Sequence, residues 1–254
     1  MSVCVERDGA VVTIVIDRPE RRNAVDPATA QALRDAFDDF EADDTLHAAV
    51  LTGSCGHFCA GYDLKSFADA GVDYDPEAEG PMGPTRRLLA KPVIAAVEGY
   101  AVAGGLELAL WCDLRVAAAG ATFGVVCRLW GVPLIDGGTV RLPRVVGQGR
   151  ALDLILTGRP VGAEEALAIG LANRVVPEGQ ARTAAERVAA ELARFPQLCL
   201  KTDRASAYAA FDGDLASALR AEAIAGAASV REGARAGAAR FAAGRGRGGD
   251  FEGI

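Results

Sequence analysis

Short apolar runs separated by amphipathic stretches dominate the chain up to residue 178 and predict strands that alternate with helices. The first two runs flank Asp8-Gly9, a dipeptide typical of a tight hairpin. A helix is expected from Asp26, whose carboxylate can cap it, to about Asp43. The expected strands are 2–7, 11–17, 48–51, 93–97, 114–118 and 174–176, and further helices are expected at 106–111, 137–146, 149–157 and 163–169.

From Glu178 onward the pattern is helical throughout, with helices expected at 179–194, 197–210, 213–228 and 230–242. Strands first and helices last are typical of an α/β core with a helical C-terminal part. We therefore expect a core domain over residues 1–195 and a helical region over residues 196–254.

Three stretches lack a strong period and are expected to be loops or turns. Residues 69–84 hold Gly, Pro, Asp and Glu and predict a mobile surface loop. A loop of this length inside a compact domain is often functional, for instance as a rim over a substrate channel. Residues 85–90 favour one or two helical turns, and residues 122–124 begin a further turn.

One stretch, residues 99–109, joins a buried apolar run to a helix through several small residues. A strand, a glycine turn and a helix start in that order leave free backbone N–H groups at the helix N-terminus. Such groups bind anions or developing negative charge. Glu107 lies in the first helical turn, so the sequence predicts an anion site with a carboxylate beside it.

A second strand-to-helix turn, residues 58–64, has the same character. Gly61 permits an unusual backbone turn, and Asp63 can cap the short helix that follows. Its backbone N–H groups are also expected to point outwards. Two such turns facing one another would hold a carbonyl oxygen from both sides, as an oxyanion hole does for an enolate.

Composition narrows the possible function classes. The 254 residues are half apolar and can bury a substantial core, while the net charge of -7 argues against a general nucleic-acid surface. No apolar run approaches the roughly 20 residues of a membrane span, and the N-terminus lacks a basic and then apolar leader, so we expect a cytoplasmic protein. No His or Cys pair joins Cys55 and Cys59 in a ligand set, so no metal site is expected.

Taken together, the motifs resemble the crotonase, or enoyl-CoA hydratase/isomerase, superfamily. The resemblance runs from about residue 10 to about residue 180 and rests on Arg18-Pro19, Asn23-Ala24-Val25 and the segments 60–64, 91–97, 104–108, 112–113, 131–142 and 156–158. It implies the crotonase (ClpP-like) fold, a spiral of ββα units, with a helical C-terminal trimerisation region. It also implies a trimer or a dimer of trimers, with the C-terminal helices at subunit contacts.

The resemblance implies roles for individual residues. The backbone N–H groups of Tyr62 and Gly104 would form the oxyanion hole for an acyl thioester, and Ala60 would lie beside the CoA adenine. Family members place basic side chains by the CoA phosphates, for which the candidates are Arg21, Arg22 and Lys65. Ordinary solvated charge explains each of these three equally well.

Family hydratases use two glutamates to add water across a double bond, and Glu107 matches the first. The second is expected four residues after Phe123, where this chain has Cys127. A thiol is a poor substitute for a carboxylate that holds a water. Asp136 could compensate, because several isomerases of the family carry a catalytic aspartate there, or it could cap the helix that begins at Gly137.

These residues predict an acyl-CoA enzyme that stabilises a thioester enolate and hydrates a trans-2-enoyl-CoA to a 3-hydroxyacyl-CoA. Glu107 and either Asp136 or Cys127 would carry the protons, with no cofactor beyond the CoA of the substrate. Two alternatives stay open, a double-bond isomerase led by Asp136 and an acyl-CoA-binding protein with little turnover. If Glu107 and Asp136 share a pocket, their repulsion should raise one pKa and so separate acid from base. Trp130 could shape the acyl pocket or belong to the core.

Overall fold

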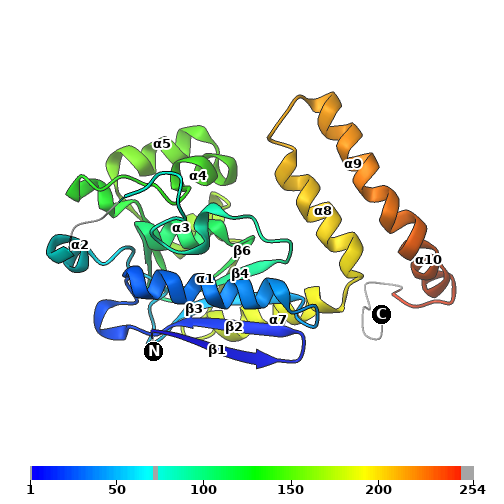
Figure 1. The fold of residues 1–254 in the computed structure, drawn as a ribbon, viewed down its shortest axis with the longest axis horizontal. Helices are drawn as coiled ribbons and strands as arrows, with labels where there is room; N and C mark the ends of the chain where they lie inside the picture. The colour runs from blue at the N-terminus through cyan, green and yellow to red at the C-terminus, as the bar shows by residue number, and fades with distance from the viewer. Residues whose placement is uncertain (1, 71–73, 247–254) are drawn as a thin grey trace. The chain divides into compact units, whose positions relative to one another are not determined.

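The structure is a computed structural model that describes residues 2–70 and 74–246 of the 254-residue chain. It divides into two units, which join between residues 190 and 191. In Figure 1 the described strands all belong to the first unit, and the second unit is helical. The domain boundary expected after residue 195 stays a prediction.

A six-stranded sheet forms the centre of the first unit, with the strand order β1-β2-β3-β4-β6-β9 (Figure 1). β1 and β2 form the predicted antiparallel hairpin, and every other pair of neighbours is parallel. All residues of β2 and β4 are buried, as expected for strands covered on both faces. The strands are β1 (Val3–Asp8), β2 (Val11–Ile16), β3 (Ala48–Gly53), β4 (Val93–Val97), β6 (Leu114–Ala118) and β9 (Arg174–Val176).

A second, three-stranded sheet has the order β5-β7-β8, formed by β5 (Tyr100–Val102), β7 (Thr122–Gly124) and β8 (Pro160–Gly162). The expectation of a turn at 122–124 is therefore wrong. Phe123 pairs with Ala101 on one side and with Val161 on the other, and all three are fully buried. Strands of three residues are too short to show a period of two, so only pairing with distant segments identifies them.

The helices of the first unit lie where the sequence predicts them, with shifted ends. Asp26 caps α1, because its Oδ1 accepts a hydrogen bond from the Thr29 N–H at 2.8 Å. Phe37 of α1 packs edge-on against Trp111 of α3, with ring centroids 4.7 Å apart. The helices are α1 (Pro27–Ala42), α2 (Leu64–Ala70), α3 (Gly104–Trp111), α4 (Gly138–Val146), α5 (Gln148–Thr157), α6 (Ala163–Ala168) and α7 (Ala181–Arg194), whose residues after 190 belong to the second unit.

The region between α2 and β4 differs from its prediction. Of the loop expected over residues 69–84, residues 69–70 belong to α2, and residues 71–73 lie outside the described residues. Gly80 and Met82 are buried, although a surface loop was expected there. Only Pro84–Arg86 form a single 3-10 turn, where one or two turns over 85–90 were expected. Beyond it the backbone pairs with other elements, since the Arg87 carbonyl accepts from Trp111 Nε1 at 2.7 Å and the Ala90 N–H donates to Glu41 at 2.8 Å.

The second unit consists of helices that follow the predicted pattern. α8 (Gln197–Ala209) contacts α9 (Leu215–Ser229), and a π-helical turn at Val230–Ala234 leads into α10 (Arg235–Ala242). None of the residues in these helices is buried. Within the part of the chain that the structure describes, no helix combines the length and apolar character that crossing a bilayer requires.

Candidate active site

A cavity of about 500 Å³ lies beside the N-terminus of α3. Its wall is mostly apolar and comes from four parts of the chain: the loop and first turns around α2, the segment 74–82, the start of α3, and residues 126–136. Seven residues that the sequence analysis singled out line this one cavity, namely Ala60, Tyr62, Gly104, Glu107, Cys127, Trp130 and Asp136.

Two backbone turns meet at this cavity. The Cys59 N–H donates to the Tyr100 carbonyl at 2.8 Å, and the Val102 N–H donates to the Cys59 carbonyl at 3.1 Å, which joins the loop before α2 to β5. A Cβ on Gly61 would come within 3.0 Å of the Gly104 nitrogen. Gly61 also has a φ of 101°, which residues with a side chain rarely adopt. Glycine at this position therefore lets the two turns approach each other closely.

The backbone N–H groups of Tyr62 and Gly104 have no hydrogen-bond acceptor among the described residues. Gly104 is the first residue of α3, and the first N–H groups of a helix have no partner within it. Tyr62 forms a parallel bridge with Val25. The hydrogen bonds of this bridge are made by its neighbours, Gly61 and Asp63, so the Tyr62 N–H points away from Val25. Both residues line the cavity, so both donors are available to an oxygen that enters it.

Ala103 holds the second turn in an unusual conformation that the sequence did not reveal. Its φ is 53° and its ψ is -124°, a combination that strains a residue with a Cβ. The Ala103 N–H donates to the Gly124 carbonyl at 2.8 Å, and its carbonyl accepts from the Glu107 N–H at 3.2 Å. These two bonds maintain the strained backbone that orients the Gly104 N–H.

Glu107 is almost fully buried, with 3% of its surface exposed. Its Oε1 accepts from the Asp136 N–H at 2.9 Å and from the Gly138 N–H at 2.8 Å. Burial, followed by repulsion from the Asp136 carboxylate, raises the pKa of Glu107 to about 7, although the two backbone donors lower it. Protonated and ionised forms of Glu107 are therefore both accessible near neutral pH.

Asp136 faces the same cavity and is 2% exposed. Its Oδ1 accepts from the Met82 N–H at 3.1 Å and from the Thr85 hydroxyl. Burial raises the pKa of Asp136, and these two hydrogen bonds oppose that increase. The alternative that Asp136 caps α4 is wrong, because the N-cap is Gly137 without a side-chain hydrogen bond, and the carboxylate is turned towards residues 82–85 instead.

Cys127 lies in a 3-10 helix, Val126–Trp130, and is also buried. Burial and the nearby Glu107 raise the pKa of its thiol above the ordinary value. A neutral thiol is a weak nucleophile. Trp130 belongs to the cavity wall rather than to the core, since it lines the cavity and is 71% exposed.

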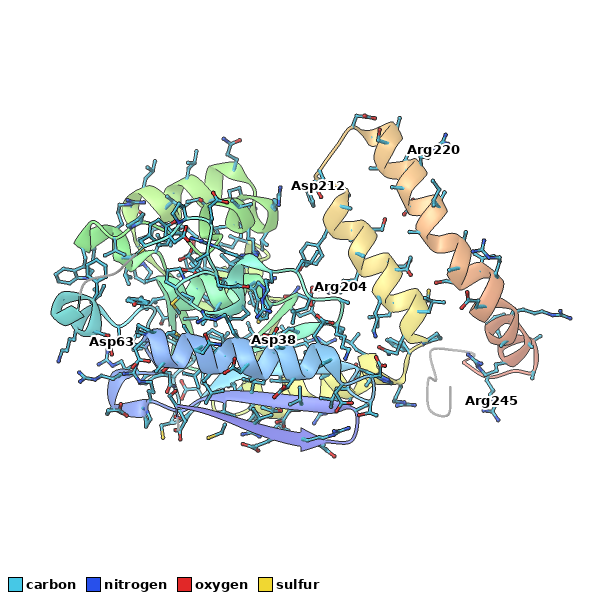
Figure 2. The ribbon with its side chains drawn as sticks, viewed as in Figure 1. Asp38, Asp63, Arg204, Asp212, Arg220 and Arg245 are labelled. Carbon is cyan, nitrogen blue, oxygen red and sulfur yellow. The ribbon has the colours of Figure 1, made fainter. Side chains whose placement is uncertain are left out.

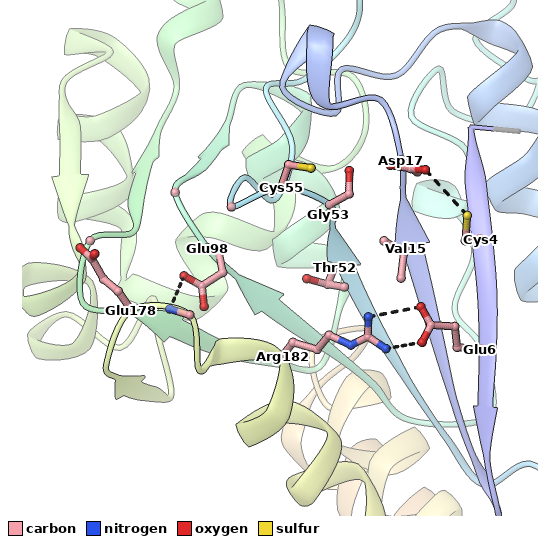
Figure 3. A pocket seen from close by; sticks show the side chains of 15 residues that line it. Cys4, Glu6, Val15, Asp17, Thr52, Gly53, Cys55, Glu98, Glu178 and Arg182 are labelled. Carbon is pink, nitrogen blue, oxygen red and sulfur yellow. Dashed lines mark hydrogen bonds and ion pairs between the residues drawn. The ribbon is translucent and has the colours of Figure 1, made fainter.

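A second cavity, of about 780 Å³, lies elsewhere on the first unit and has a different character (Figure 3). Its Glu6 carboxylate accepts two hydrogen bonds from Arg182, and Glu98 accepts from the backbone of Gly179 and Ala181 before and at the start of α7. These carboxylates serve structural contacts. Among the described residues, no group of three or more His, Cys, Asp and Glu side chains could hold a metal ion.

Comparison with known families agrees with this geometry. A model of the family described as enoyl-CoA hydratase/isomerase matches residues 6–244. The chain belongs to this family. It is accordingly an enzyme of the hydratase/isomerase type, as the sequence predicts.

Several members of the family are closely similar. Enoyl-CoA hydratase EchA19 of Mycobacterium tuberculosis is 41% identical over 192 residues, which cover 73% of this chain and 72% of that protein. The mevalonyl-coenzyme A hydratase sidH of Aspergillus fumigatus is 36% identical over 187 residues, 72% of this chain and 69% of that protein. The crystal structure of enoyl-CoA hydratase EchA1 from Mycobacterium marinum has a TM-score of 0.89 at 36% identity, covering 95% of this chain and 96% of that chain. The expected crotonase fold is confirmed.

The remaining candidates of the family's CoA site are less closely grouped. Ala60 lines the cavity, whereas Arg21, Arg22 and Lys65 are exposed and outside its described wall. The Arg22 guanidinium lies over the Tyr100 ring, 5.4 Å from its centroid. Lys65 is in the first turn of α2, which Asp63 caps by accepting from the Lys65 N–H at 3.1 Å; Figure 2 labels Asp63 at this end of the helix. The roles of the three basic residues in binding CoA stay predictions.

Sequence reasoning missed the segment that supports Asp136. Gly80, Met82 and Thr85 contact its carboxylate, yet they lie in a stretch whose composition indicated only loop and turn. The Gly, Pro and acidic residues of this stretch indicated its backbone conformation, but they did not indicate that part of it would be buried. The buried pair Asp136 and Thr85 is separated by 51 residues along the chain, so no local signal could have identified it.

Proposed function

We propose that this chain hydrates the double bond of a trans-2-enoyl-CoA and releases a 3-hydroxyacyl-CoA. The observation that supports this most is that Glu107 and Asp136 line one cavity together with the free N–H groups of Tyr62 and Gly104. The thioester carbonyl would accept a hydrogen bond from both N–H groups. Negative charge that develops on this oxygen as water adds at C3 would then be stabilised.

The two carboxylates can divide the proton transfers. We assign Asp136 as the base that removes a proton from water while the water oxygen bonds to C3 and the double-bond electrons move towards the thioester oxygen. Glu107, with its pKa raised to about 7, is the acid that gives its proton to C2 as the carbonyl re-forms. A proton returning from Asp136 to Glu107 through solvent restores the starting state, so the cycle requires no further cofactor.

The acyl group that this cavity would hold is apolar. Beyond the thioester, the wall consists largely of aromatic and aliphatic side chains such as Phe67, Val126, Trp130 and Ile135. The acidic side chains in the described wall are Glu107 and Asp136, and no basic side chain of the wall could pair with an acyl group that ends in a carboxylate. We therefore propose neutral enoyl chains as substrates.

Isomerisation is the second candidate, and Cys127 favours it. Cys127 occupies the position where family hydratases are expected to have their second glutamate, and its thiol is held neutral by burial. Moving a double bond requires one carboxylate that removes a proton from the acyl chain and returns it at another carbon. Asp136 alone could perform both transfers.

The oligomer is also a proposal. We expect a trimer or a dimer of trimers, with the helices of the second unit in subunit contacts. In support, these helices expose large apolar side chains, including Leu198, Leu215, Leu219, Ile224 and Phe241. A subunit contact would cover these apolar side chains, which are exposed in the single chain. The cytoplasmic location stays an expectation from the sequence.

The test is to incubate the purified protein with short, medium and long trans-2-enoyl-CoA and 3-enoyl-CoA thioesters and to follow enoyl absorbance and product mass. Loss of absorbance with a mass gain of one water supports hydration. Interconversion at constant mass would replace the proposal by isomerisation. Binding of the thioesters without any conversion would contradict both hydration and isomerisation, and would indicate an acyl-CoA-binding protein.

A further inference from the structure

The carboxylate of Asp136 rests in a cradle formed by the buried segment 80–86. The Met82 N–H and the Thr85 hydroxyl both donate to the same oxygen, Oδ1. The Gly80 backbone lies close to both oxygens and leaves no space for a side chain. A Cβ on Gly80 would come within 2.2 Å of Oδ1 and within 2.4 Å of Thr85 Oγ1. Oδ2 of Asp136 makes no hydrogen bond to the described residues, so it is the oxygen left to accept a proton.

Two arginines tie this cradle to the loop that carries Asp136. Arg141 of α4 donates to the Asp136 carbonyl at 3.0 Å and to the Thr85 carbonyl at 2.6 Å. Arg86 donates to the Ile135 carbonyl at 3.3 Å. These hydrogen bonds link the backbone on both sides of the contact between Asp136 and Thr85.

We propose that Thr85 is a positioning residue, whose hydroxyl holds Oδ1 of Asp136 so that Oδ2 faces the substrate and acts as the base. This inference rests on the hydration reaction proposed above. Among the described residues, the Met82 N–H and the Thr85 hydroxyl are the two donors to Oδ1, and the Thr85 hydroxyl is the only one of them from a side chain. Thr85 is fully buried, and no other function of its hydroxyl is evident from its contacts.

Thr85 also influences the protonation of the base. The charged and titratable groups around Asp136 are Glu107, Tyr62, Arg86 and Arg141. Among the favourable contacts, the Thr85 hydroxyl has the largest effect in lowering the pKa of Asp136 against burial. Without the hydroxyl this pKa rises. Since a base works only when deprotonated, the acidic limb of the pH profile of kcat should then move to higher pH.

The experiment compares Thr85→Val, which has nearly the same shape without the hydroxyl, with Thr85→Ser, which keeps it. For Thr85→Val we expect kcat for enoyl-CoA hydration to fall by about 10- to 100-fold, the range for losing a hydrogen bond to a charged group, with KM nearly unchanged. The acidic limb of its pH profile should move upwards. Thr85→Ser should keep the kcat and the pH profile of the wild type.

A second set of variants separates positioning from structure. In an Asp136→Asn background, Thr85→Val should cause no further loss of kcat, because Thr85 acts only through Asp136. If Thr85→Val does not fold, Thr85→Ser against Thr85→Ala still isolates the hydroxyl. An unchanged kcat and pH profile without the hydroxyl, or equal losses with and without Asp136, would overturn the inference. A wild-type protein that does not hydrate any enoyl-CoA would instead contradict the proposed function.

Discussion

The burial of Glu107 leads to a prediction in which stability and activity change in opposite directions. Replacement of Glu107 by Gln keeps an Oε1 that can accept from the Asp136 and Gly138 N–H groups, now 2.9 and 2.8 Å from the carboxylate oxygen. It removes the charge that the buried site disfavours. Glu107→Gln should therefore fold more stably than the wild type at alkaline pH while losing activity.

The magnitude follows from the pKa of Glu107, which rises from 4.5 to about 7 in the folded protein. Each pKa unit corresponds to about 1.4 kcal/mol, so the ionised carboxylate costs about 3 kcal/mol of folding stability. A raised pKa means that the folded state binds the proton more tightly. The cost is absent below the unfolded pKa of 4.5, grows as the pH rises towards about 7, and is constant above that.

Urea unfolding at about pH 5 and about pH 8 measures this effect. The gain in unfolding free energy for Glu107→Gln should be small at the lower pH and approach about 3 kcal/mol at the higher. Glu164→Gln, a change at an exposed residue of α6, is the control and should show no such difference. In the hydration assay, kcat of Glu107→Gln should fall by about 10²- to 10⁴-fold. A variant that is no more stable than the wild type at the higher pH would refute the argument that the site disfavours the charge.

Three further predictions concern the rest of the site. Asp136→Asn should lower kcat by about 10²- to 10⁴-fold while acyl-CoA affinity, measured by calorimetry, stays within a few-fold; an active variant would remove Asp136 from the mechanism. Cys127→Ser should leave kcat within about threefold, because the thiol transfers no proton in the proposed cycle, and a large loss would contradict that. Gly61→Ala should lose activity and about 1–3 kcal/mol of stability in urea unfolding, since its Cβ would meet the Gly104 turn; unchanged behaviour would show that the two turns can separate without effect.

Much of the fold could be predicted from local pattern. The hairpin around Asp8-Gly9, the cap at Asp26 and the long helices each depend on residues close together in the chain, and the structure confirms them. The glycine turn before Glu107 is also a local signal, because a strand, glycines and a helix start necessarily leave free N–H groups at that point.

The short strands and the buried part of the expected loop could not be predicted in this way. β7 is extended because it pairs with β5 and β8, and its own three residues carry no periodicity. Gly80 and Met82 are buried because they pack around the Asp136 carboxylate, which is distant in sequence. Their own neighbours in sequence are polar or small and gave no sign of burial.

By itself, the sequence determined that this protein has a strand-to-helix glycine turn with a carboxylate in its first helical turn, and that its motifs belong with those of the enoyl-CoA hydratase/isomerase family. Tertiary structure brought Asp136 into the same cavity as Glu107. Asp136 could have capped α4, but burial against Thr85 and Met82 turns it towards the cavity instead. The physical reason is that a cap depends on neighbours three or four residues away, whereas the placement of two buried carboxyl groups in one cavity depends on contacts between segments that only folding brings together.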